Sequence, residues 1–269
     1  REMESGTGIN RPLLTVIIGS GNVASAVGPA LEKAGAIDVL QVYSPTAGHA
    51  AGLAAMLGHA EAVTDSSAVV SGADLYLVAV KDDAIAGVAA TIGVRGGVWL
   101  HTSGGVECSE LAPITDDYGV FYPLQTFTKG VAVDFGDVPV FVEGHTGRAL
   151  AVAERLGQCL SGKVYHADGR RRSQLHAAAV FACNFTNHLW AIADDVLRRE
   201  TGTDLTVLRP LLEETMRKAL SMRPAAGQTG PARRGDRGVI EHHKSLLKPD
   251  EAELYEIMSQ HIIDYYERN

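Results

Sequence analysis

The sequence predicts an α/β protein in which an N-terminal doubly wound parallel sheet is followed by an all-α C-terminal domain. Up to about residue 165, short apolar and β-branched runs alternate with helical stretches, as in parallel sheets whose strands are buried on both faces. A glycine-rich turn directly follows the first of these runs. Beyond that point the strand-like runs stop and long helical patterns take over. The domain limits are therefore predicted at 1–165 and 166–269.

The first domain is predicted to alternate strands and helices from residue 13 onward. LLTVII at 13–18 is the first strand, and the helix from Val23 to Lys33 that follows it ends at Gly35, a residue favoured at helix C-termini. A second strand over 38–44 and a second helix over 50–57 repeat the unit. Further strands are expected at 74–80, 96–101, 119–124 and 138–144.

The second domain is predicted to consist of helices and one irregular segment. Residues 170–200 form one long helical pattern, opened by Arg170, Arg171 and Arg172, which are expected to be exposed. A second helix spans 204–221, with Asp204 as its N-cap and Pro210 as an unfavourable residue inside it. The segment 224–236 is too rich in glycine and proline to be helical. The last helix spans 249–266, with proline and acidic residues at its start.

Composition predicts a soluble, cytoplasmic protein that binds neither nucleic acid nor membranes. The formal net charge is −8, and no apolar run reaches the roughly 18–20 residues of a membrane span. The first residues, REMESGTGINRP, lack the apolar centre of a signal peptide. Cys108, Cys159 and Cys183 lack C-x-x-C spacing, which predicts neither a disulfide framework nor a zinc site. The neighbouring His242 and His243 lack the spacing of metal ligands, so no metal is expected.

The glycine-rich turn matches a dinucleotide-binding motif. Gly19, Gly21 and Ala24 fit G-x-G-x-x-[GA] between the first strand and the first helix. Gly19 allows the tight turn, Gly21 leaves room for a pyrophosphate, and the amides at the helix N-terminus face the anion. The alternative is a glycine turn that merely joins strand to helix. The placement favours a Rossmann-type cofactor site formed by Gly19, Ser20, Gly21, Asn22 and Val23.

The end of the second strand favours NADP over NAD. An NAD site usually places Asp or Glu there to bind the ribose 2′-OH, whereas this segment reads Val42-Tyr43-Ser44-Pro45-Thr46. No carboxylate would repel a 2′-phosphate, and Ser44 and Thr46 offer hydroxyl donors. No Arg or Lys stands beside them, and a plain turn remains the alternative.

Six further motifs occur in order across almost the whole chain. They are AVKDDAI (79–85), HTSGGV (101–106), YPLQTF (122–127), VFVEG (140–144), LHAAAVFACNF (175–185) and TGPARRGD (229–236). Together they resemble a family of Rossmann-like oxidoreductases whose C-terminal half is known only as a conserved domain of unknown function. Relatives of that family include pyrroline-5-carboxylate reductase, deazaflavin-dependent NADP oxidoreductases, ketopantoate reductase and 6-phosphogluconate dehydrogenase. TGPARRGD is the most specific of the six motifs.

The resemblance implies a cofactor cleft between the two domains and a homodimer formed through the helical domains. Val80 and Lys81 would then lie near the adenosine and its ribose. His101, Thr102 and Ser103 would lie near the nicotinamide, outside the carboxyl ends of the strands.

His176 and Asn184 are the candidate catalytic residues. Hydride transfer to a carbonyl or imine needs a group that protonates or polarises the acceptor. Both residues lie in an apolar stretch, eight positions apart and so within about 80° on one helix face. His176 would donate a proton and Asn184 would orient the carbonyl; alternatively, each is a satisfied core residue. Related β-hydroxyacid dehydrogenases carry a Lys four residues before an Asn, where this chain has Val180, so their mechanism does not transfer directly.

The TGPARRGD segment is the candidate substrate-binding loop. Arg234 would pair with a carboxylate or phosphate through two hydrogen bonds, and Asp236 would hold the guanidinium in place. Thr229 and His242 complete the predicted set. The alternative is that the arginines form a solvated face.

Two functions remain open at this point. The first is an NADP-dependent oxidoreductase that reduces a small anionic carbonyl or imine compound, such as a 2-keto acid. The second is a non-catalytic NADP-binding sensor or scaffold that kept the fold without the usual Lys.

Overall fold

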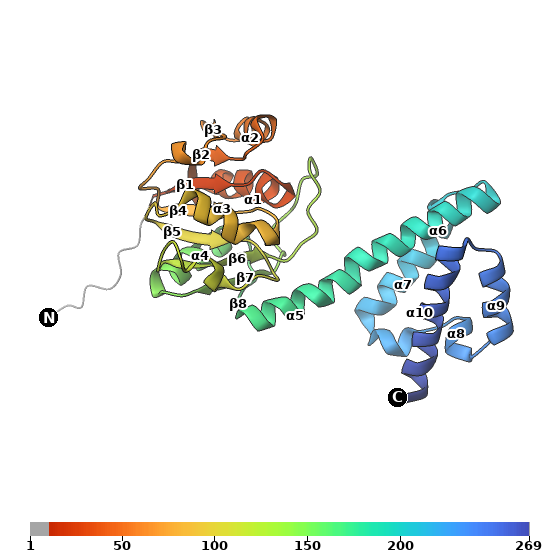
Figure 1. Cartoon of the computed structure of the whole chain (residues 1–269). Helices are drawn as coiled ribbons and strands as arrows, with labels where there is room; N and C mark the ends of the chain where they lie inside the picture. Colours follow the sequence, from red (N-terminus) through yellow and green to blue (C-terminus); the bar gives the residue numbers. More distant parts are fainter. Residues whose placement is uncertain (1–10, 269) are drawn as a thin grey trace. The chain divides into compact units, whose positions relative to one another are not determined.

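The computed structural model describes residues 11–268, which divide into two compact units (Figure 1). Unit 1 ends at Val180, and unit 2 runs from Phe181 to the last described residue. The predicted domain limits of 1–165 and 166–269 stay a prediction. The two units are described separately below.

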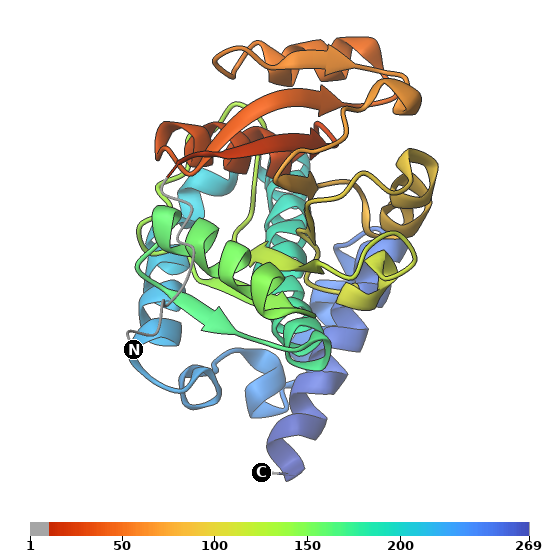
Figure 2. The same cartoon turned by 90° about the vertical axis from the view of Figure 1, so that its left-hand side faces the viewer.

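Unit 1 is built on one eight-stranded sheet in the order β3-β2-β1-β4-β5-β6-β7-β8 (Figures 1 and 2). Strands β1 to β6 are mutually parallel, and their order 3-2-1-4-5-6 is that of a doubly wound dinucleotide-binding sheet. β7 pairs antiparallel with β6, and β8 runs parallel to β7. The strands are β1 (Leu13–Ile18), β2 (Ile37–Tyr43), β3 (Glu61–Val63), β4 (Leu75–Val78), β5 (Val98–His101), β6 (Tyr118–Pro123), β7 (Val140–Gly144) and β8 (Val164–His166). The fold class predicted from the sequence is confirmed, although the three-residue strands β3 and β8 were not predicted.

Both faces of the central strands of this sheet are buried, which explains the apolar runs in those strands. Along β1, Ile17 packs into one core cluster, and Val16 and Ile18 pack into another. Helices α1 and α4 contribute to the first cluster, and α3 contributes to the second. The helices of unit 1 are α1 (Asn22–Lys33), α2 (Ala47–Ala54), α3 (Ile85–Ile92), α4 (Gly147–Leu160) and α5 (Gly169–Ala179).

Unit 2 is helical, with two differences from the sequence predictions. The single helix predicted over 170–200 is interrupted, because a π-helical turn over Val180–Phe185 joins α5 to α6. The segment 224–236, predicted to be non-helical, contains a 3₁₀ turn at Pro224–Gly227 and the short helix α8. A proline opens both of these turns, at a position where its missing N–H is not needed. The helices are α6 (Thr186–Thr201), α7 (Arg209–Ser221), α8 (Pro231–Arg234), α9 (Arg237–Ser245) and α10 (Pro249–Arg268).

The start of α7 resolves the position of Pro210. Asp204 accepts a hydrogen bond from the Thr206 amide at 2.9 Å and so caps a 3₁₀ turn over Leu205–Leu208. α7 begins after this turn, which places Pro210 in its first turn rather than in its interior. Asp204 is therefore an N-cap, but of this 3₁₀ turn and not of the helix predicted over 204–221, which begins only at Arg209, and Pro210 does not disrupt that helix.

Few side chains are buried in unit 2. Among its described residues only Ile240, Ser259 and Ile263 are buried, and α6 and α7 contain no buried residue. Several large apolar side chains are exposed instead, including Leu211, Met216 and Leu220 on α7. Within residues 11–268, no helix has the length and hydropathy needed to cross a bilayer.

Candidate functional site

The glycine turn after β1 adopts the conformation that the motif requires. Gly19 has φ +105°, and a Cβ at this position would lie 2.4 Å from the carbonyl oxygen of Ala79. β1 therefore passes so close to the end of β4 that only glycine fits. Gly21 precedes α1 as its N-cap, and no side chain caps the helix there. The amides of the first turn of α1 are thus open to a ligand.

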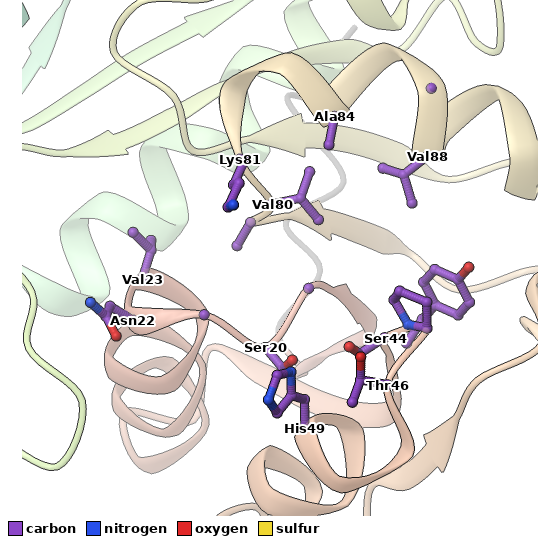
Figure 3. Close-up of a pocket in the computed structure, with 16 residues that line it drawn as sticks. Ser20, Asn22, Val23, Ser44, Thr46, His49, Val80, Lys81, Ala84 and Val88 are labelled. Carbon is purple, nitrogen blue, oxygen red and sulfur yellow. The ribbon is translucent and has the colours of Figure 1, made fainter.

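A cavity of about 1030 Å³ lies at the carboxyl ends of β1, β2 and β4 (Figure 3). This is the point where the strand order reverses, which is where doubly wound sheets bind their ligands. Its lining includes nine of the predicted cofactor residues: Gly19, Ser20, Gly21, Asn22, Val23, Ser44, Thr46, Val80 and Lys81. None of the residues that line it carries a carboxylate.

One wall of the cavity is formed by the side chains of Ser44, Thr46 and His49 (Figure 3). Ser44 is 5% exposed, and Thr46 is the N-cap of α2 but makes no side-chain capping bond. His49 was not predicted from the sequence. The signal that could have found it is its place in the first turn of a helix that begins at the end of β2. Lys81 extends into the cavity from the wall formed by the segment after β4 (Figure 3).

The loop after β5, Thr102 to Val106, is held by hydrogen bonds within itself and to His101, the last residue of β5. The Ser103 amide donates to Nδ1 of His101 at 3.2 Å, and Nε2 of His101 lies 3.3 Å from the Glu107 carbonyl. The Ser103 hydroxyl accepts from the Gly105 and Val106 amides. Burial, and secondarily the charge of Arg172, lower the pKa of His101 to about 4. The ring is therefore neutral at pH 7, with its proton on Nε2 and directed at the Glu107 carbonyl.

His101, Thr102 and Ser103 are buried and are not among the residues that line the cavity. Their predicted contact with the nicotinamide stays a prediction. In this structure the imidazole of His101 shapes the loop through both ring nitrogens.

The depressed pKa of His101 makes stability depend on pH in a defined window. Above about pH 6.5 the ring is neutral in both the folded and the unfolded chain, so the full contribution of neutral His101 to the free energy of unfolding is present. Between pH 6.5 and about 4 only the unfolded chain binds the proton, so the free energy of unfolding falls, by up to about 3 kcal/mol in total. Denaturant titrations should show a constant difference in the free energy of unfolding between the wild type and His101→Gln above pH 6.5. Below pH 6.5 the wild type should lose stability relative to His101→Gln. Parallel curves down to pH 4 would contradict this.

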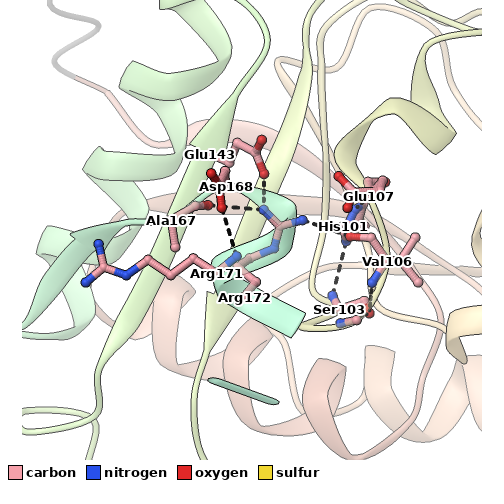
Figure 4. A network of polar contacts seen from close by, with 10 residues as sticks. His101, Ser103, Val106, Glu107, Glu143, Ala167, Asp168, Arg171 and Arg172 are labelled. Carbon is pink, nitrogen blue, oxygen red and sulfur yellow. Dashed lines mark hydrogen bonds and ion pairs between the residues drawn. The ribbon is translucent and has the colours of Figure 1, made fainter. Parts of the chain in front are cut away.

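The prediction that Arg172 is exposed is wrong. Its side chain is wholly buried, and Figure 4 shows the polar contacts that its guanidinium makes. Nη1 pairs with the Glu143 carboxylate on β7 and donates to the Ala167 carbonyl at 3.2 Å, and Nη2 donates to the Val106 carbonyl at 2.8 Å. Arg172 thus joins α5 to β7 and to the loop after β5. Arg170 and Arg171 are exposed, as predicted.

His176 lies one helical turn beyond Arg172 and contacts the carboxyl end of β6. Its Nδ1 is 2.9 Å from the hydroxyl of Tyr122, and the two rings meet edge to face. Tyr122 is 8% exposed. A Cβ on Gly104 would lie 2.5 Å from the Tyr122 ring, so the loop after β5 passes directly against this tyrosine. The sequence predicts a role for His176 but none for Tyr122, although Tyr122 lies in the YPLQTF motif.

The remaining predicted site residues lie in unit 2. Asn184 is exposed in the π-helical turn, so its predicted alignment with His176, which assumed regular α-helical rotation, has no basis here. Arg234 donates to Asp236 at 2.8 Å, the pairing that the sequence analysis expected. Thr229 and His242 are both exposed. Their roles stay predictions. Among the described residues, no group of three or more His, Cys, Asp or Glu side chains is arranged to hold a metal ion.

Comparisons with known proteins agree with this architecture. Residues 2–126 match a Rossmann-like domain, and residues 138–262 match a domain of unknown function, DUF2520. A candidate NADP oxidoreductase from Bacteroides fragilis is 38% identical, with a TM-score of 0.88 over 94% of this chain and 98% of that chain. No curated protein matches the sequence significantly.

Two more distant structures share the fold alone. A protein from Thermotoga maritima is 20% identical, with a TM-score of 0.66 over 95% of this chain and 100% of its own. A reductive aminase from Aspergillus terreus, solved with NADPH and ethyl-5-oxohexanoate, is 16% identical, with a TM-score of 0.67 over 95% of this chain and 99% of its own. The coverage and identity of the Bacteroides fragilis match, together with the two domain matches, show that this chain belongs to the family that joins a Rossmann-like domain to a DUF2520 domain.

Proposed function

We propose that this protein is an NADP-dependent oxidoreductase that reduces a small anionic carbonyl or imine compound, with 2-keto acids as the first class to test. The observation that carries the proposal is the cavity at the reversal of strand order, bounded by the glycine turn and free of carboxylates. The Bacteroides fragilis relative is described as a candidate NADP oxidoreductase, and the reductive aminase was solved with NADPH. Both descriptions agree with such a site.

The cavity residues fit the parts of NADP. The open amides at the start of α1 suit the pyrophosphate. The wall of Ser44, Thr46 and His49 offers two hydroxyl donors and an imidazole to the 2′-phosphate, and Lys81 adds a cation to the cavity. A carboxylate at the end of β2, which would favour NAD, is absent from this wall.

In the proposed reaction, bound NADPH supplies the hydride that reduces the substrate carbon. His176 supplies the proton that the substrate oxygen or nitrogen takes up, because it is a half-buried imidazole at the carboxyl edge of the sheet. Arg234 is the proposed anchor for the anionic group of the substrate. Its bond to Asp236 keeps the guanidinium in one orientation while leaving it 62% exposed.

The test has two parts. Calorimetry should show NADPH binding at least about tenfold more tightly than NADH, a difference of about 1.4 kcal/mol. NADPH consumption should then be followed with 2-keto acids, with aldehydes, and with ketones mixed with amines. Turnover of one class supports the proposal, and failure to bind either cofactor overturns it. Tight binding without any turnover would instead favour the sensor or scaffold, the function suggested by Val180 in place of the Lys of related dehydrogenases.

We further propose that the protein is a homodimer that pairs through unit 2. α6 and α7 bury no residue, yet α7 exposes Leu211, Met216 and Leu220, the last at 83%. Apolar side chains gathered on one element usually mark a surface that another chain covers. Light scattering at micromolar concentration should give twice the mass of one chain, and the mass of a single chain would contradict the proposal.

A further inference from the structure

The bond between Tyr122 and His176 determines which nitrogen of His176 can serve a substrate. Nδ1 is occupied by the phenol at 2.9 Å. The two residues are 54 positions apart, on β6 and α5, and both belong to unit 1. The Tyr122 ring is also fixed by Gly104, whose missing side chain leaves the space that the ring occupies. The contact is thus enforced by the loop after β5 as well as by the hydrogen bond.

The phenol keeps its proton throughout the physiological range. Burial, with a smaller contribution from the charge of Asp82, raises the pKa of Tyr122 to about 12. A protonated phenol can donate to Nδ1 of a neutral imidazole, and its oxygen can accept from Nδ1–H of a charged one. The contact therefore survives a change in the charge of His176 and keeps the ring in one orientation in both states.

We infer that Tyr122 is the positioning residue for His176, holding Nδ1 so that Nε2 is the nitrogen that gives its proton to the substrate. This inference rests on the proposed reductase function. As the substrate carbon gains the hydride, the electron pair of its double bond moves to oxygen or nitrogen, and that atom takes the proton from Nε2. The imidazolium becomes a neutral ring whose remaining proton is on Nδ1, which donates to the Tyr122 oxygen. A proton from water then returns to Nε2, and when the resting ring loses its Nδ1 proton to water the phenol donates to Nδ1 again, which leaves neutral His176 with its proton on Nε2.

The decisive variant is Tyr122→Phe, which keeps the ring against Gly104 and removes only the hydroxyl. A matched control stands on the same strand. Tyr118 is 6% exposed and stacks flat on His145 at 4.5 Å between ring centroids, at the opposite end of β6. Tyr118→Phe removes the same atom from an equally buried tyrosine that has no part in the site. Gly104→Ala is a second variant, because it leaves the hydroxyl in the chain but forces the ring to move.

Two readouts separate positioning from a purely structural role. The first is two-bond ¹H–¹⁵N NMR of histidine-labelled protein, with His176→Gln to assign the signal. In the wild type and Tyr118→Phe, neutral His176 should carry its proton on Nε2, whereas Tyr122→Phe and Gly104→Ala should show a mixture of the two tautomers. The second is kinetics with the substrate found in the screen. There kcat should fall about 10- to 100-fold in Tyr122→Phe, part of what a proton donor contributes, with an unchanged Kd for NADPH.

The outcomes distinguish this inference from the proposed function. An unchanged His176 tautomer in Tyr122→Phe overturns the inference, whatever the activity. An altered tautomer with unchanged kcat also overturns it, because the protonation of His176 would then not limit the reaction. If the wild type reduces nothing, the proposed function fails, and the NMR comparison alone decides whether Tyr122 holds His176.

Discussion

Replacing Gly19 by alanine is expected to weaken NADPH binding by about 100-fold or more. The new Cβ would lie 2.4 Å from the oxygen and 2.8 Å from the carbon of the Ala79 carbonyl, and both atoms belong to the backbone of the segment after β4. The φ of +105° adds strain of about 1–3 kcal/mol for any residue with a side chain. The turn must shift to relieve both, and a shift moves the α1 amides away from the pyrophosphate. A loss of about 2.7 kcal/mol corresponds to the expected factor of 100.

Two other glycines separate the causes of this effect. Gly35 has φ +70° but open space around a Cβ, so Gly35→Ala should cost about 1 kcal/mol of stability and leave NADPH affinity unchanged. Gly21 has ordinary φ and equally open space, so Gly21→Ala should leave stability nearly unchanged and weaken binding by filling the space over the pyrophosphate. Calorimetry with NADPH and denaturant unfolding measure the two quantities. Wild-type affinity in Gly19→Ala would contradict the proposed site.

The parts of the fold that the sequence predicted are those set by local physics. Strands buried on both faces are almost entirely apolar, as 13–18 is apart from Thr15. A strand that turns into a helix over a diphosphate needs glycine at fixed positions. Ser44 and Thr46 could be predicted as cofactor-site residues because the end of the second strand of such a sheet lies beside the cofactor ribose. The cavity is lined by residues that follow three different strands: the glycine turn after β1, Ser44 and Thr46 after β2, and Val80 and Lys81 after β4.

The parts that escaped prediction depend on contacts between distant segments. Arg172 resembles its exposed neighbours in sequence, and the approach of Glu143 and of the Val106 carbonyl, 29 and 66 positions earlier, shows why it is buried. Tyr122 pairs with a histidine 54 positions away. The π-helical turn at Val180–Phe185 follows no local rule that distinguishes it from the α-helix on either side. The segment 224–236 was predicted to be non-helical because of its prolines, yet it contains two short helical turns. Proline disrupts the interior of a helix, but it is favoured at the first position, where both of these turns place it.

Arg172→Met is expected to lower the free energy of unfolding of unit 1 by about 3 kcal/mol. Methionine fills much of the space of the arginine stem, but it leaves the carbonyls of Val106 and Ala167 without their donor. It also leaves the Glu143 carboxylate without its cation. Removing one partner of a buried ion pair typically costs about 3–5 kcal/mol. The lower end applies here because the Glu143 side chain is 23% exposed and water can hydrate part of its charge.

The neighbouring arginine provides the control for this prediction. Arg171 is exposed on the same helix turn, so Arg171→Met should change stability by no more than about 0.5 kcal/mol. Adding Glu143→Gln to Arg172→Met removes the unpaired charge and should recover about 1–2 kcal/mol, which a double-mutant cycle measures.

Arg172 also joins the loop after β5 to the helix turn that precedes His176. Arg172→Met should therefore lower kcat even where denaturant curves show it folded. If Arg172→Met and Arg171→Met unfold at the same denaturant concentration, the buried ion pair does not stabilise α5 against the sheet.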